Sequence, residues 1–80
     1  MSDVNGRRDR HPATVGLLRY FTWQHLPERL QPVSRGCAEL AEQMFDALPD
    51  GPELTTGLRK LLEAKDCFVR AALDLPAGDR

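Results

Sequence analysis

The sequence predicts an all-α fold, in which a short N-terminal helix is followed by a long antiparallel helical hairpin assembled as a homo-oligomer. Apolar residues recur at the three-and-four spacing of buried helix faces, and no segment shows the period-two alternation of a strand. The strongest turn signal, LPDGPE at residues 48–53, separates the two longest helical segments. We expect one helical domain over residues 11–75, a mobile N-terminal tail over residues 1–10 and a C-terminal tail over residues 76–80.

The small size of the chain is the reason to expect association. A core built from 80 residues supplies roughly 3–5 kcal/mol of net stability, and small folds compensate with disulfides, metals or further copies. Cys37 and Cys67 lie inside helical patterns with no secretory signal before them, which indicates buried or half-buried thiols rather than a disulfide. His11 and His25 lack the paired spacing that zinc requires. Oligomerisation is the remaining route.

The first two helices follow from their prolines and apolar stripes. The first is predicted over residues 12–22, because Pro12 suits a first helical position where no amide hydrogen bond is needed. The second is predicted over residues 27–48 and contains Pro32, which removes one helix hydrogen bond and should bend or divide the helix near residues 28–32. Its apolar face is predicted to consist of Val33, Cys37, Leu40, Ala41, Met44 and Leu48.

The third helix is predicted over residues 52–74, with Pro52 at its start and Glu53 in its first turn, where the helix dipole favours an anion. A turn of about three residues forces it to run antiparallel to the second helix. Its buried stripe is predicted to contain Leu58, Leu61, Leu62, Val69 and Ala72. Two such helices with one short addition cannot enclose a core, so the remaining apolar face is expected to contact another copy.

Lys65 lies on this apolar stripe, four residues after Leu61 and four before Val69. Its aliphatic stem can run along the leucines while the ammonium reaches water. In an oligomer, the same charge would instead need a carboxylate of a neighbouring chain or a bound phosphate. The other basic residues of the helix are Arg59, Lys60 and Arg70; Arg59–Glu63 and Asp66–Arg70 have the spacing of ordinary surface ion pairs.

The aromatic segment YFTWQH at residues 20–25 contains a second candidate set. Phe21 fits the core stripe of the first helix, whereas Tyr20 and Trp23 fall off it. Such aromatics suit a protein interface, and they also stack on nucleobases at about 1–3 kcal/mol per base. Beside a few cations and His25, they are typical of a nucleotide pocket.

Other functions are disfavoured by composition and missing motifs. The sequence contains no glycine-rich phosphate loop, nucleophile elbow or HExxH motif, so we expect no enzyme activity and no cofactor. A formal net charge of −1 argues against general DNA binding. No apolar run approaches the roughly 18 residues of a membrane span, so a cytoplasmic location is expected.

The segments YFTWQHLPERLQPVS and LPDGPELTTGLRKLLEAKDCFVRAAL resemble a family of short bacteriophage proteins, especially from phages of actinobacteria. The resemblance covers roughly residues 12–75. These proteins are similar to the helical anti-defence sponges that counter CBASS and Thoeris immunity. Such sponges are tetramers or hexamers that bind cyclic oligonucleotide or cyclic ADP-ribose-type signals without cleaving them. Pro32 and Gly36 depart from the family pattern, in which the second helix is continuous.

The resemblance implies a phage protein that sequesters a cyclic di- or trinucleotide, such as 3′,3′-cGAMP, in the host cell cytoplasm. Lys65 would meet a ligand phosphate at a protomer boundary, with Arg59, Lys60 or Arg70 as a second phosphate contact. Tyr20 or Trp23 would stack on a base, and His25 would bind a base edge or a phosphate. The alternative is a small helical oligomerisation or protein-interaction module with no small ligand, in which Lys65 pairs with Glu39 or Glu42 across an interface and Trp23 anchors it.

Overall fold

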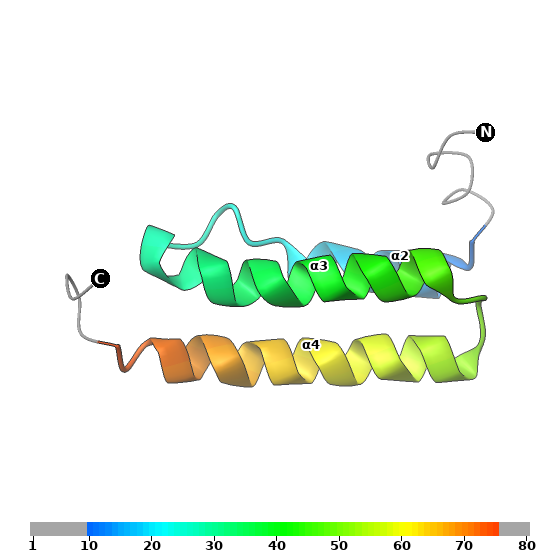
Figure 1. Cartoon of the computed structure of the whole chain (residues 1–80). Helices are drawn as coiled ribbons and strands as arrows, with labels where there is room; N and C mark the ends of the chain where they lie inside the picture. Colours follow the sequence, from blue (N-terminus) through cyan, green and yellow to red (C-terminus); the bar gives the residue numbers. More distant parts are fainter. Residues whose placement is uncertain (1–9, 76–80) are drawn as a thin grey trace.

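The computed structural model describes residues 10–75, which form three α-helices and two 3-10 turns (Figure 1). Within these residues no strand is present, so the all-helical prediction is confirmed. The remaining residues of the two predicted tails, 1–9 and 76–80, lie outside the described residues. The elements in chain order are α2 (Pro12–Leu18), η1 (Arg19–Phe21), η2 (Glu28–Leu30), α3 (Gln31–Ala47) and α4 (Pro52–Ala72).

Helices α3 and α4 lie side by side in opposite directions, and α2 packs against both of them (Figure 1). The core lies where the three helices meet. Its most deeply buried large side chains are Phe45 of α3 and Leu58 of α4. The other members of this core are Leu17, Leu18, Phe21, Cys37, Ala41 and Leu54. None of the described helices combines the length and apolar character needed to cross a membrane.

Pro32 marks the start of α3 rather than a bend inside it. The segment predicted to begin near Pro27 first forms the 3-10 turn η2, and the α-helix begins at Gln31 with Pro32 in its first turn. A proline is tolerated there because the first amides of a helix have no partner within the helix. The helix is therefore divided just before Pro32 and continues through Gly36 to Ala47.

The buried face of α3 overlaps the predicted apolar face only in part. Ser34, Cys37, Ala41 and Phe45 are buried, whereas Leu40, Met44 and Leu48 are exposed. The predicted apolar face is therefore buried only at Cys37 and Ala41. Leu40, Met44 and Leu48 belong to a second apolar stripe beside the one containing Phe45, and they line an open groove against α4 rather than the core. Cys67, expected to be at least half-buried, is exposed on α4.

Arg10 belongs to the folded domain, so the prediction of a mobile tail extending through residue 10 is wrong at this position. Its Nη1 and Nη2 donate hydrogen bonds to the carbonyl oxygens of Phe45 and Leu48, both at 2.8 Å. Its Nε donates to Asp50 Oδ1 at 2.7 Å, and its guanidinium lies 4.0 Å from the centre of the Phe45 ring. The last carbonyls of a helix lack partners within it, so Arg10 caps the C-terminus of α3.

Candidate ligand-binding site

A cavity of about 380 Å³ lies between η1, the loop after it and the C-terminal half of α4. It brings together four of the seven predicted ligand-binding residues: Tyr20, His25, Lys65 and Arg70. We call it the basic pocket. Its complete lining is Arg19, Tyr20, Thr22, His25, Leu26, Lys65, Asp66, Val69 and Arg70.

The loop wall of the basic pocket is held by hydrogen bonds to backbone carbonyls. Thr22 Oγ1 donates to the Arg19 carbonyl at 2.7 Å, which closes the end of η1. Gln31, at the start of α3, donates from Nε2 to the carbonyls of Gln24 at 3.2 Å and Leu26 at 2.9 Å. The loop that carries His25 is therefore tied to a helix of the core.

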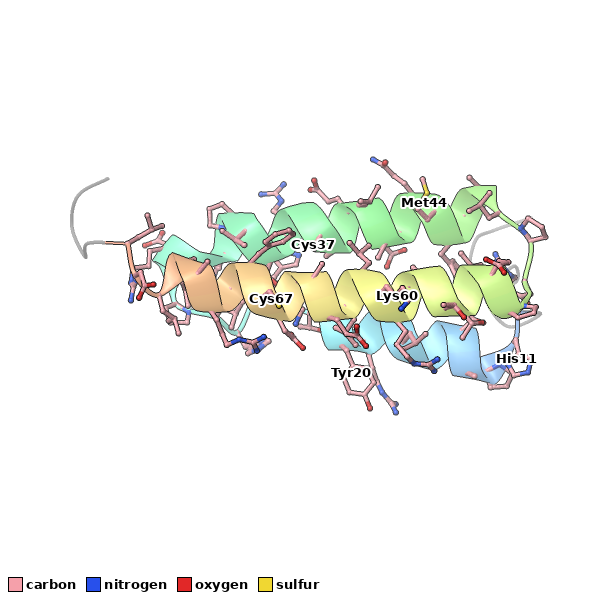
Figure 2. The ribbon with its side chains drawn as sticks, turned by 90° about the horizontal axis from the view of Figure 1, so that it is seen from below. His11, Tyr20, Cys37, Met44, Lys60 and Cys67 are labelled. Atoms are coloured by element: carbon pink, nitrogen blue, oxygen red, sulfur yellow. The ribbon has the colours of Figure 1, made fainter. Side chains whose placement is uncertain are left out.

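The helical wall of the basic pocket comes from α4 alone. Lys65, Asp66, Val69 and Arg70 are spaced so that they share one side of the helix. Figure 2 shows Tyr20 projecting from η1 at the edge of the molecule next to α4. Two segments, residues 19–26 and 65–70, thus supply the two walls although 38 residues of the sequence lie between them.

Lys65 buries its stem and places its ammonium at the basic pocket. Its side chain is only 14% exposed, and Nζ lies 3.0 Å from Asp66 Oδ1. The charge also acts on Cys37 of α3: burial raises the pKa of the Cys37 thiol, and the Lys65 ammonium partly offsets this increase. Lys65 therefore neither extends freely into water nor lacks a negative partner; it pairs with the next residue of its own chain.

The two arginines retain donors for a ligand. Arg70 Nη2 lies 3.4 Å from Cys67 Sγ, and sulfur is a weak acceptor. Arg19 lies over the face of Tyr20, with 5.6 Å between its Cζ and the ring centre, and Tyr20 remains 55% exposed. Within residues 10–75, neither the Asp66–Arg70 nor the Arg59–Glu63 pair suggested by the sequence is formed.

The charge of the basic pocket favours anions. Arg19, Lys65 and Arg70 provide three positive charges against the single carboxylate of Asp66. Guanidinium groups bind phosphate oxygens in pairs, and an exposed aromatic face beside them suits a base. The described residues contain no cluster of three or more side chains suited to holding a metal ion.

Three predicted residues lie elsewhere. Trp23 lines a different cavity with Glu39 and Glu42, and Arg35 lies over its ring at 5.2 Å. Arg59 lines a cavity near the start of α4, about 16 Å along the helix from Arg70. Lys60 is exposed, about 140° around α4 from Lys65.

Arg19 and Asp66 also line the basic pocket, although neither was predicted as a ligand-binding residue. Asp66 directly follows Lys65, and Arg19 directly precedes Tyr20. Their positions beside two predicted residues are a signal, but adjacent residues in a helix point about 100° apart, so adjacency alone does not predict a shared pocket.

Comparisons with protein-family models, with curated proteins and with solved structures find no match for this chain.

Proposed function

We propose that this protein is a phage anti-defence sponge that binds a cyclic nucleotide immune signal and withholds it from host CBASS-type effectors. The observation that carries the proposal is the convergence of Arg19, Tyr20, His25, Lys65 and Arg70 on one pocket. A cyclic dinucleotide has two phosphates and two flat bases, which match cations beside an aromatic face. Sequestration requires binding alone.

Each polar or aromatic residue proposed to contact the ligand has a role. Lys65 and Arg70 bind the phosphates, Tyr20 stacks on a base, and His25 hydrogen-bonds a base edge or a phosphate. Arg19 holds Tyr20 in place through the contact with its ring and adds a further positive charge. A sponge must bind more tightly than the effector, and each tenfold margin requires about 1.4 kcal/mol.

The test is calorimetric titration of the protein with 3′,3′-cGAMP, cyclic tri-AMP and a cyclic ADP-ribose isomer. Lys65→Ala should weaken binding of the preferred ligand about ten- to a hundredfold, because a hydrogen bond to a charged group contributes roughly 1.5–3 kcal/mol. Lys60→Ala is the matched control, since Lys60 is an exposed lysine of the same helix outside the basic pocket. Chromatography of the ligand released on heating should show that it is unchanged.

Two results would contradict the proposal. One is the absence of binding heat with all three ligands. The other is an equal loss of affinity in the Lys65→Ala and Lys60→Ala proteins, which would indicate a general charge effect rather than a site.

A second candidate function, a protein-interaction module, is favoured by an apolar groove of about 580 Å³ between α3 and α4. Leu40, Met44 and Leu48 form one side and Leu54, Gly57, Leu58 and Leu61 form the other. Large exposed apolar surfaces on small proteins usually mark contact sites. The two functions are compatible, because the groove and the basic pocket share no lining residue.

A further inference from the structure

The apolar groove lies on the opposite edge of the molecule from the basic pocket. Figure 2 shows Met44 projecting from α3 at one edge and Tyr20 from η1 at the other. Met44 lines the groove and Tyr20 lines the basic pocket. The α3–α4 pair therefore has an apolar side that faces away from α2. None of the described residues covers this side along the groove.

The apolar surface continues beyond the groove along both helices. On α4, a second stripe runs beside the core stripe with the alternating four-and-three spacing of a coiled-coil seam. Its members on the helix are Gly57, Leu61, Ala64, Phe68 and Ala71, and Leu75 continues the spacing just beyond the end of α4. Val33, Leu40, Met44 and Ala47 form the matching stripe on α3. We call these two stripes together the outer face.

Gly57 lies in the middle of the groove, inside a long helix where glycine is a poor helix former. A Cβ added to it would meet nothing within 4 Å, so packing within this chain does not require a glycine there. A glycine at such a position permits the close approach of another backbone. Gly57 therefore leaves room for a neighbouring helix at this point of the outer face.

We infer that the outer face is the interface through which two copies of this chain associate. The molecule measures 44 × 24 × 17 Å, so a long face is comparable with the roughly 800 Å² that each partner contributes to a standard interface. Two copies with a formal net charge of −1 each repel one another only weakly. The inference rests on the apolar surface and not on nucleotide binding.

A pair of helices with coiled-coil spacing is matched by another pair with the same spacing, which a second copy supplies. A two-fold arrangement places the same patch on both sides of the contact, so the outer face of one copy packs against the outer face of the other. The four helices then form a bundle with α2 and the basic pocket of each copy on the outside.

The test compares two glutamate substitutions, one in α4 and one at its C-cap, by sedimentation velocity from 5 to 200 µM, concentrations on the order of those used for weak dimers. Phe68 and Leu73 are each 53% exposed, but Leu73 lies about 140° around the helix from Phe68 and outside the outer face. Wild-type protein and Leu73→Glu should sediment as the same oligomer of the 9.0 kDa chain. Phe68→Glu should have at most half that mass while its helical circular dichroism signal persists.

A monomeric wild-type protein across this range would overturn the inference, as would a Phe68→Glu protein with the wild-type mass. Met44→Lys tests the same face from α3; if Phe68→Glu loses its helical signal, the mass of folded Met44→Lys decides the question. Titration of the Phe68→Glu protein with 3′,3′-cGAMP separates the two proposals, because the basic pocket lies within one chain. If the Phe68→Glu protein loses assembly but still binds 3′,3′-cGAMP, both the dimer interface and the proposed function stand. If the wild-type protein assembles but binds no cyclic nucleotide, only the proposed function is contradicted.

Discussion

Asp50 accepts a hydrogen bond from Arg10 Nε at 2.7 Å, across a separation of forty residues in the sequence. Its other carboxylate oxygen accepts a hydrogen bond from the His11 backbone amide at 2.8 Å. Both contacts favour the ionised carboxylate, so the His11 amide and then Arg10 hold the pKa of Asp50 below its ordinary value of 3.8. This carboxylate joins the start of α2 to the turn between α3 and α4.

The first prediction concerns the pH dependence of this contact. Because the folded-state pKa of Asp50 is lowered, its contribution to stability is fully present above the ordinary pKa and is lost as the pH falls through the folded-state value. The difference in urea midpoint between wild-type protein and Asp50→Asn should therefore be constant from pH 7 to about pH 5 and shrink below about pH 4. Asp46→Asn, at an exposed position of α3, is the control and should show a much smaller change. A pH-independent difference for Asp50→Asn would contradict the assignment.

The second prediction concerns Asp66, the single acid of the basic pocket. Asp66→Asn removes the partner of Lys65 and a negative charge beside the proposed phosphates. Affinity for a bound cyclic nucleotide should rise by up to about fivefold, the 0.2–1 kcal/mol typical of an exposed charge pair. Calorimetry of the variant measures this change. Weaker binding would show instead that Asp66 positions Lys65 for the ligand.

The third prediction concerns Ser34, whose Oγ is fully buried and has no hydrogen-bond partner among the described residues. Ser34→Ala removes this unsatisfied hydroxyl and should raise the free energy of unfolding by roughly 1 kcal/mol. Thr14 is the natural comparison, because its buried hydroxyl lies 3.0 Å from Thr55 Oγ1. Thr14→Val should lower the free energy of unfolding by about 0.5–1.5 kcal/mol. Urea denaturation measures both free energies of unfolding. An equal decrease in the Ser34→Ala and Thr14→Val proteins would contradict the difference predicted between the two hydroxyls.

The fourth prediction concerns Phe45, the large side chain at the centre of the core. Phe45→Ala should cost about 3–5 kcal/mol, which equals the whole net stability expected for a core of this size. The variant should lose most of its helical circular dichroism signal at 25 °C. Tyr20→Ala, at an exposed position, should retain it. A folded Phe45→Ala protein would mean that association supplies most of the stability.

The sequence predicted helices well because helix formation depends on local signals. Pro12 and Pro52 lie at the starts of α2 and α4, as their missing amides and fixed φ favour. Lys65 was singled out because its charge interrupts an apolar stripe, and its side chain is indeed largely buried. These conclusions required only spacing along one helix.

The sequence did not predict the features that depend on how the helices pack together, such as which of two neighbouring apolar faces of α3 is buried. Met44 and Phe45 are adjacent and both apolar. The packing of α2, α4 and Arg10 against one side of α3 decides that Phe45 is buried and Met44 exposed. The role of Arg10 likewise requires the turn at Asp50 to lie beside the start of α2. Trp23 was grouped with Tyr20 by sequence, but the loop after η1 directs them to different cavities.

The position of the basic pocket between α4 and the segment that follows α2 links binding to local folding. Helix α2 has only seven residues, and helices that short are marginal without packing, so its release from the α3–α4 pair should be the easiest partial unfolding of the domain. That opening separates the two walls of the pocket while the outer face remains intact. A ligand that contacts both walls therefore shifts this equilibrium toward the closed state. Hydrogen exchange of the α2 amides would slow in proportion to ligand occupancy, so the exchange rate of α2 would report whether the pocket is filled.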